Sequence, residues 1–116
     1  MPPILISMLH VEGKHIATDG DGFLEHFDEW NTVVANTIAA AEQINLSDAH
    51  WEILHLLREF YRQFEQSPAM RALVKYVGQQ LGKDKGNSIY LLKLFPGSPA
   101  KIASKIAGLP RPENCL

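Results

Sequence analysis

The chain has 116 residues, of which 46% are hydrophobic and 21% charged, a composition typical of a single globular domain and not of a disordered or fibrous protein. Its formal net charge is −2, whereas dedicated nucleic-acid-binding proteins show a strong excess of basic residues, so the charge argues against that class. A single cysteine excludes an internal disulfide and a cysteine-based zinc site.

The first residues, 1–8, are expected to form an N-terminal extension, because two consecutive prolines favour extended backbone. The apolar run over 4–11 is interrupted by Ser7 and His10 and is too short to span a bilayer. It also lacks the basic start of a signal peptide. We therefore expect a cytoplasmic protein without membrane contact. In the cytoplasm, thiols stay reduced.

Residues 9–18 predict a β-hairpin. Two short apolar-flanked runs surround Glu12-Gly13-Lys14, which places a glycine at the turn. The next four residues, Asp19-Gly20-Asp21-Gly22, predict a second turn, because aspartate and glycine tolerate positive φ.

From Phe23 onward the spacing of apolar residues predicts helices only. The apolar face of the first helix repeats at three- and four-residue spacing and consists of Phe27, Trp30, Val34, Ile38 and Ala41. The second helix is expected to follow an N-cap at Ser47 and to run to about Glu65.

Two Ser-Pro pairs are predicted to start further helices, because a capping hydroxyl followed by proline suits the first helical turn. Ser67-Pro68 opens the third helix, and Ser98-Pro99 opens the fifth. Each is expected to end at a glycine, Gly82 for the third helix and Gly108 for the fifth.

A short fourth helix, capped by Asn87 or Ser88, lies between these two. The tail over 109–116 has prolines at alternate positions, which exclude a helix and favour an extended arm. The predicted fold is therefore mainly α: a small N-terminal β-hairpin, a five-helix bundle and an extended C-terminal arm. The predicted organisation is an extension over 1–8, a helical domain over 9–108, and a flexible arm over 109–116 that carries the cysteine.

The cysteine, Cys115, follows two prolines near the end of the chain. Free cysteines are usually buried, whereas chain ends are commonly exposed. A thiolate on a thin arm can enter a partner's active site, which suits a reaction whose cargo is the sulfur itself. A thiol pKa of about 8.5 leaves little thiolate at neutral pH. If the arm folds back, we expect Arg111, Lys105 and Lys101 to stabilise the thiolate or a persulfide; the alternative is that Arg111 is a solvated charge. From position alone, an accidental surface thiol or one packed against the domain is the alternative.

Arg71 and Lys75 lie one helical turn apart and are expected to line a groove for the arm or for a partner, or else to form a solvated face. The five histidines show no metal-ligand spacing, so the sequence predicts no metal site. A helix-turn-helix over 47–81 is an alternative interpretation, although two basic residues on its third helix are few for recognition of DNA.

Several segments form one ordered set along the chain. They are Glu12-Gly13-Lys14, the region 28–30, His50-Trp51-Glu52, Leu57-Arg58-Glu59-Phe60-Tyr61, Ser67-Pro68-Ala69-Met70-Arg71, Leu73-Val74-Lys75, Lys85-Gly86-Asn87-Ser88, Tyr90-Leu91, Leu94-Phe95-Pro96-Gly97, Pro99-Ala100-Lys101, and Ile106-Ala107-Gly108-Leu109-Pro110-Arg111-Pro112 with Cys115. Together they resemble the DsrC/TusE family of sulfur-relay proteins over roughly residues 9–116.

The resemblance implies a small, mostly helical domain with a flexible C-terminal arm. It implies that Cys115 accepts sulfur as a persulfide from an upstream carrier and passes it on, as a sulfurtransferase-type carrier without a cofactor. For TusE-type members it implies a TusBCD-like donor complex. The implied acceptor is the enzyme that makes 2-thiouridine at the tRNA wobble position, so contact with tRNA is only indirect.

DsrC-type members carry a second cysteine eleven positions before the penultimate one, and Ser104 occupies that position here. Since serine cannot form a disulfide, this departure favours the TusE-like role with a single cysteine. The alternatives are a DsrC-like partner in sulfur oxidation, or a DNA-binding or redox regulatory module that does not transfer sulfur.

Overall fold

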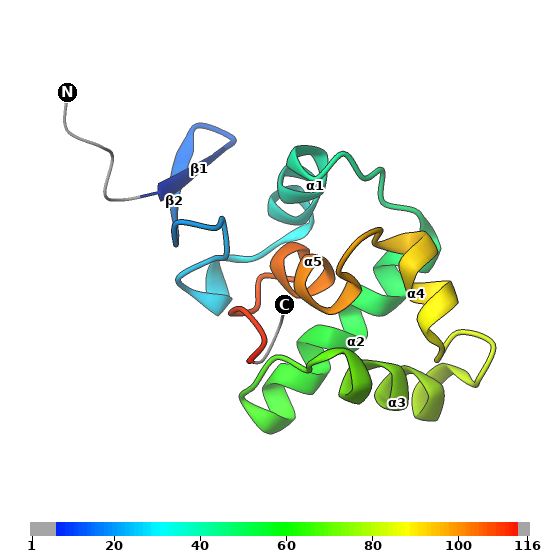
Figure 1. Ribbon diagram of the computed structural model, residues 1–116. Helices are drawn as coiled ribbons and strands as arrows, with labels where there is room; N and C mark the ends of the chain where they lie inside the picture. Colours follow the sequence, from blue (N-terminus) through cyan, green and yellow to red (C-terminus); the bar gives the residue numbers. More distant parts are fainter. Residues whose placement is uncertain (1–6, 114–116) are drawn as a thin grey trace.

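The structure is a computed structural model that describes residues 7–113, and it consists of a β-hairpin followed by five α-helices (Figure 1). Strand β1 (Ser7–Val11) pairs antiparallel with β2 (Lys14–Thr18) in a register that places Met8 opposite Ala17. The predicted hairpin is confirmed, and its first strand begins two residues before the predicted start.

The segment between the hairpin and the first α-helix contains no α-helix, so the prediction of helices from Phe23 onward is wrong for residues 23–31, apart from one short 3₁₀ turn. Asp19 shapes a turn there, since its Oδ1 accepts hydrogen bonds from the backbone N–H groups of Asp21 (2.8 Å) and Phe23 (3.0 Å). Phe23 is buried, and a short 3₁₀ helix, η1 (Phe27–Glu29), follows. The large side chains of this loop are spaced as on a helix, but each makes a separate contact with the domain: Phe23 is buried, and Trp30 donates a hydrogen bond to Ile106.

The first helix, α1 (Thr32–Ala41), begins after Asn31, whose side chain accepts a hydrogen bond from the backbone N–H of Val34 (2.9 Å). A side-chain acceptor at this position satisfies one of the otherwise unpaired N–H groups of the first turn. This cap fixes the start of α1 at Thr32, so the residues before Asn31 are not part of the helix.

The second helix, α2 (Asp48–Phe64), follows the predicted cap Ser47. The ring of His50 accepts a hydrogen bond at Nδ1 from the Ser47 N–H (3.0 Å) and donates one from Nε2 to the Leu94 carbonyl (2.7 Å). The carbonyl can only accept, so the proton of the neutral ring lies on Nε2. This buried histidine ties the start of α2 to the end of the fourth helix.

The third helix, α3 (Met70–Leu81), begins two residues later than Ser67-Pro68 predicts, with Ala69 at the N-cap. The Ser67 hydroxyl does not cap the helix and donates a hydrogen bond to the carbonyl of Pro110. Ser67 thus connects the segment before α3 to Pro110, which is far away in the sequence.

The last two helices begin where their caps predict, and the fifth ends just before the predicted glycine. In α4 (Ser88–Leu94), the cap Asn87 accepts a hydrogen bond from the backbone N–H of Tyr90 (2.8 Å). The fifth helix, α5 (Pro99–Ile106), is followed by Gly108 with a φ of 77°. This left-handed conformation favours glycine and turns the chain out of the helix.

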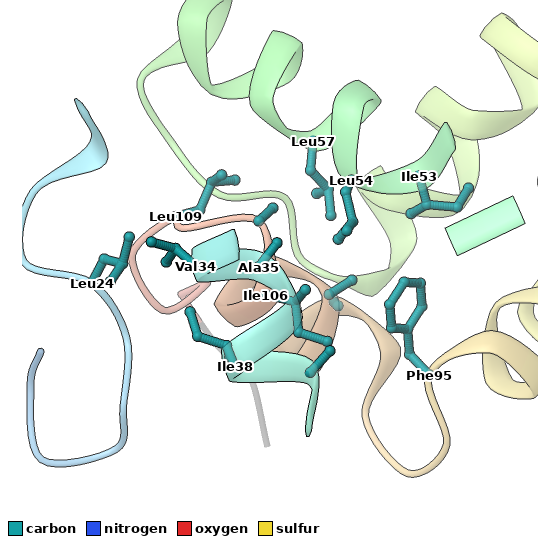
Figure 2. Close-up of a cluster of buried hydrophobic side chains, with 14 of the residues drawn as sticks. Leu24, Val34, Ala35, Ile38, Ile53, Leu54, Leu57, Phe95, Ile106 and Leu109 are labelled. Carbon is teal, nitrogen blue, oxygen red and sulfur yellow. The ribbon is translucent and has the colours of Figure 1, made fainter. Parts of the chain in front are cut away.

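Helix α5 packs against α1, α2, α3 and α4, and so lies at the centre of the bundle (Figure 1). Figure 2 shows part of the core that surrounds it, with Leu109 beside the side chains of α1 and α2. Leu109 is completely buried, so the first residue of the predicted arm belongs to the core. In the described part of the chain, no helix has the length and apolarity needed to cross a membrane.

Candidate functional site at the C-terminal arm

Two polar side chains hold the backbone at the end of α5. Trp30 donates a hydrogen bond from Nε1 to the carbonyl of Ile106 (2.8 Å). Arg58 donates from Nη1 to the carbonyl of Ala107 (2.8 Å), and from Nη2 to that of Phe27 (3.2 Å). The bonds to Ile106 and Ala107 occupy carbonyls that a helix end otherwise leaves unpaired, and they fix the direction in which the chain leaves α5.

The guanidinium of Arg58 lies between two aromatic rings, 3.7 Å from the centroid of Phe27 and 4.3 Å from that of Trp30. The residue is only 6% exposed. Burial, and to a smaller extent the nearby charge of Arg62, lower the pKa of Arg58 to about 10. It therefore stays protonated at neutral pH, and its hydrogen bonds to carbonyls are of the stronger, charge-assisted kind.

Leu109 completes the first part of the arm. Its backbone N–H donates to the carbonyl of Ser104 (2.9 Å), and its side chain is buried. We call residues 106–109 the arm root. All its polar contacts come from buried or half-buried groups, so the place where the arm leaves the domain is fixed.

The next residues, 110–113, which we call the strap, lie along the surface and are held by different contacts. Ser67 donates a hydrogen bond to the Pro110 carbonyl, and the guanidinium of Arg111 pairs with the carboxylate of Asp21. The Arg111 and Asp21 side chains are 45% and 53% exposed. The strap thus runs between two turns that are far apart in sequence, one after the hairpin and one between α2 and α3 (Figure 1).

Two of the predicted cations, Lys105 and Arg111, meet at the ring of Phe23. The Lys105 Nζ lies 5.3 Å from its centroid and the Arg111 guanidinium carbon 5.7 Å. Both charges already have partners, because Lys105 pairs with Glu42 (3.1 Å) and Arg111 with Asp21.

The other predicted site residues are dispersed. Lys101 is half-buried in the first turn of α5, and Arg71 and Lys75 are exposed on α3. Within 7–113, no ion pair involves any of these three. Cys115, the predicted catalytic residue, lies outside the described residues, and so do the contacts predicted for it. In the same range, no group of three or more candidate ligand side chains could hold a metal ion.

A groove of about 390 Å³ opens between the strap and the connection from α2 to α3. We call it the arm groove. The residues that line it include Phe60, Ala69 and Ala72, and also Glu65 and Glu113. Since Glu113 comes two residues before Cys115, the groove lies next to the point where the described arm ends.

The sequence alone does not identify the residues that hold the arm. It predicts a turn at Asp21, a core position for Trp30 and a helix cap at Ser67. Arg58 offered a signal, because it lies on the apolar face of α2, four residues after Leu54. A charged residue in that position is almost always paired when buried.

The chain is similar to known proteins over nearly its whole length. Residues 10–116 match the family described as DsrC like protein. The chain is 51% identical to the "Sulfurtransferase TusE homolog" of Haemophilus influenzae over 109 residues, which are 94% of this chain and all of that protein. It is 49% identical to "Sulfurtransferase TusE" of Photorhabdus laumondii, over 94% of this chain and 98% of that protein.

Two solved structures are also similar. The NMR structure of Allochromatium vinosum DsrC has a TM-score of 0.87 and 43% identity, over 96% of this chain and 99% of that one. The crystal structure of the oxidized gamma-subunit of the dissimilatory sulfite reductase, DsrC, from Archaeoglobus fulgidus has a TM-score of 0.82 and 38% identity, over 95% and 100%. Both similarities extend over nearly the whole chain.

Proposed function

We propose that this chain, which belongs to the family of DsrC-like proteins, is a TusE-type sulfurtransferase that carries sulfur as a persulfide on Cys115. The observation that carries this proposal is the identity of about half of all positions to sulfurtransferases named TusE, over nearly the whole length of each chain. Cys115 is the chain's one thiol, so it is the residue on which a transferred sulfur is bound.

The reaction consists of two thiol exchanges. The thiolate of Cys115 attacks the outer sulfur of a donor persulfide, the donor's sulfur–sulfur bond breaks, and the donor leaves as a thiolate. The product is Cys115 with one added sulfur. A nucleophile of the acceptor enzyme then attacks that outer sulfur, and the Cys115 thiolate is released. Neither step needs an external oxidant or a cofactor.

A sulfur carrier has a partner that donates sulfur and a partner that accepts it. We propose that the donor is a TusBCD-like complex and that the acceptor is the enzyme that makes 2-thiouridine at the tRNA wobble position. The tRNA is then bound by the acceptor, and this chain meets it only indirectly. The net charge of −2 is consistent with a protein that does not bind tRNA by itself.

The fixed arm root supports this proposal. Trp30 and Arg58 hold the backbone at Ile106 and Ala107, so the arm always leaves the domain at the same point. A nucleophile that must be presented in turn to two partner proteins benefits from a fixed exit, because less conformational freedom is lost at each encounter.

The proposal is tested by incubating the full-length protein with a persulfidated donor and measuring its intact mass. We expect one added sulfur, about 32 Da, which dithiothreitol removes. Cys115→Ser should take up none. Ser104→Ala is the matched control, since it removes an oxygen and leaves the thiol in place, and it should take up sulfur like the wild type. Equal uptake by Cys115→Ser would rule the mechanism out.

A second candidate is a DsrC-like partner in sulfur metabolism, which the similarity to two solved DsrC structures favours. Ser104 argues against a role that needs two thiols in one chain, because its hydroxyl cannot form a disulfide with Cys115. Binding to a purified dissimilatory sulfite reductase without sulfur uptake from a TusBCD-like complex would favour this second candidate.

A further inference from the structure

The β-hairpin brings together two histidines that are five positions apart in the sequence. Glu12 and Gly13, the two residues between β1 and β2, both have a positive φ (50° and 79°). Two-residue turns of this conformation fix the register of a hairpin, and in this register His10 lies directly opposite His15. A spacing of five does not place two side chains on one face of a helix, but here it places two imidazoles side by side.

The two imidazole rings are in contact and are exposed to solvent. Their centroids are 4.2 Å apart and their planes are inclined by 70°. Both residues are exposed, at the edge of the domain where the hairpin lies (Figure 1). Within the described residues, His50 is the histidine whose ring is held by hydrogen bonds, and no ion pair includes a histidine. The ring nitrogens of His10 and His15 are therefore available to a ligand.

The separation of the two rings is close to what a shared metal ion requires. Two imidazoles bound to one ion, with metal–nitrogen bonds of about 2.0–2.1 Å at an angle of about 90–120°, have centroids roughly 4.5–5.5 Å apart. Compared with the observed 4.2 Å, the rings need to move apart by roughly 1 Å. Exposed side chains make such a movement by small rotations about their side-chain bonds.

The next side chain on this face of the hairpin is a thioether. Side chains alternate between the two faces of a strand, so Met8 lies on the same face as His10. Met8 is 49% exposed and lies opposite Ala17, which makes it a diagonal neighbour of His15. Diagonal neighbours are about 7–8 Å apart, a distance that long side chains span. In the part of the chain that the structure describes, no third histidine, cysteine or carboxylate joins this pair as a metal ligand.

The chemistry of these three side chains selects the metal. Two imidazoles alone suit copper, nickel or zinc, whereas a thioether is a soft ligand that selects Cu(I). Magnesium, calcium and manganese prefer carboxylate and carbonyl oxygens, which this face does not add to the histidine pair. Two nitrogens and one sulfur thus favour a soft monovalent ion over the hard divalent ones.

We propose that the exposed face of the hairpin is a binding site for Cu(I), which is held by His10, His15 and Met8. Binding is an exchange of ligands: the copper stays in the +1 state, its previous ligands leave, and no electron is transferred. Because the ligands come from both strands, the ion connects β1 to β2 and stabilises the hairpin against local opening. The site is independent of the sulfur-carrier function proposed above, since it uses none of the residues that hold the arm.

The test uses the full-length chain with Cys115→Ser, because a thiolate binds Cu(I) strongly and would compete with the hairpin. Cu(I) is added without oxygen as its acetonitrile complex, and binding is followed by NMR. Ag(I) serves as a second soft probe that air does not oxidise, and Zn(II) as the harder comparison. We expect one Cu(I) per chain, with shifts of the imidazole signals of His10 and His15 and of the Met8 methyl signal. Amide hydrogen exchange in β1 and β2 should become slower.

Four variants of that chain locate the site. His10→Thr and His15→Thr keep a residue that favours strands, and each should lower the affinity for Cu(I) at least about tenfold. Met8→Leu conserves volume, and it should lower the affinity for Cu(I) about tenfold without changing that for Zn(II). Unchanged amide signals of the hairpin show that each variant keeps the fold. His26→Thr, at an exposed position outside the hairpin, is the matched control and should bind as the parent chain does.

The proposal is overturned if one equivalent of Cu(I) or Ag(I) leaves the signals of His10 and His15 unshifted. Equal losses of affinity in His10→Thr and His26→Thr would also overturn it, because copper would then bind to separate histidines. An unchanged affinity for Cu(I) in Met8→Leu, or tighter binding of Zn(II) than of Cu(I) to the parent chain, would refute the assignment to a soft ion.

Discussion

The arm root and the strap are consecutive segments of one chain, yet they are held in opposite ways. The root has a buried leucine and carbonyls that accept from a tryptophan and a sandwiched arginine. The strap is held by one serine hydroxyl and by an ion pair whose side chains are about half exposed. An exposed ion pair contributes roughly 0–1 kcal/mol, whereas hydrogen bonds from a buried charged group contribute about 1.5–3 kcal/mol each.

This difference separates two properties that a sulfur carrier needs. The exit point of the arm is part of the folded core and changes only if the core changes. The path of the strap depends on weak surface contacts and can be altered without loss of the fold. Substitutions in the root should therefore lower global stability, and substitutions in the strap should act mainly on the arm itself.

The largest effect is expected for Gly108→Ala in the root. Gly108 has a φ of 77°, and an added Cβ would lie 2.6 Å from Cδ1 of Trp30. Backbone strain and the clash with the indole together should lower the free energy of unfolding by about 3 kcal/mol. Denaturation with urea, followed by circular dichroism, measures this.

Gly97→Ala is the matched control for Gly108→Ala. Gly97 has a φ of 96°, and an added Cβ would meet nothing within 4 Å. It should lose only the backbone contribution, about 1–2 kcal/mol. If both variants lost the same stability, the close packing of the indole on the arm root would have no energetic importance.

The next largest effect is expected for Arg58→Met, which keeps most of the volume and removes the guanidinium. The carbonyl of Ala107 loses its donor, and that of Phe27 keeps only the long bond from the Trp30 N–H (3.4 Å), so we expect a loss of about 2–3 kcal/mol in urea denaturation. Arg62→Met on the same helix is the control. Its side chain is 56% exposed, and it should lose at most about 0.5 kcal/mol. Equal losses would mean that Arg58 does not support the root.

The sequence predicted the elements well where their signals are local. Ser47 and Asn87 begin their helices because a capping side chain bonds to a backbone group within three residues. The hairpin likewise follows from a glycine between two short apolar-flanked runs. These features require no knowledge of distant parts of the chain.

The arm contacts could not be predicted, because their partners are distant in sequence. Ser67-Pro68 and Ser98-Pro99 carry the same signal, yet only the second begins a helix at its proline. The Ser67 hydroxyl bonds to Pro110, a residue 43 positions away. In the same way, Trp30 has helical spacing from Phe27, but its indole is directed to the end of α5. Periodicity detects a buried side chain and does not identify its partner.

A smaller effect on global stability is expected when the strap contacts are removed. Asp21→Asn combined with Ser67→Ala should lower the free energy of unfolding by about 1 kcal/mol. Amide hydrogen exchange at Arg111 should become faster by more than this loss explains, because the strap then opens without global unfolding. A loss as large as that of Arg58→Met would show that strap and root form one cooperative unit.

The smallest effect is expected for Ser104→Ala. Ser104 is completely buried beside the arm root, and within 7–113 its hydroxyl has no hydrogen-bond partner. Removing an unsatisfied buried hydroxyl recovers its desolvation cost, so stability should stay within about 0.5 kcal/mol of the wild type or rise slightly. Thr37→Ala is the comparison, since that hydroxyl donates to the Val33 carbonyl (2.8 Å) at a partly exposed site. A loss above about 1.5 kcal/mol for Ser104→Ala, measured by urea denaturation, would mean that the hydroxyl has a partner in the folded protein and contributes to holding the root.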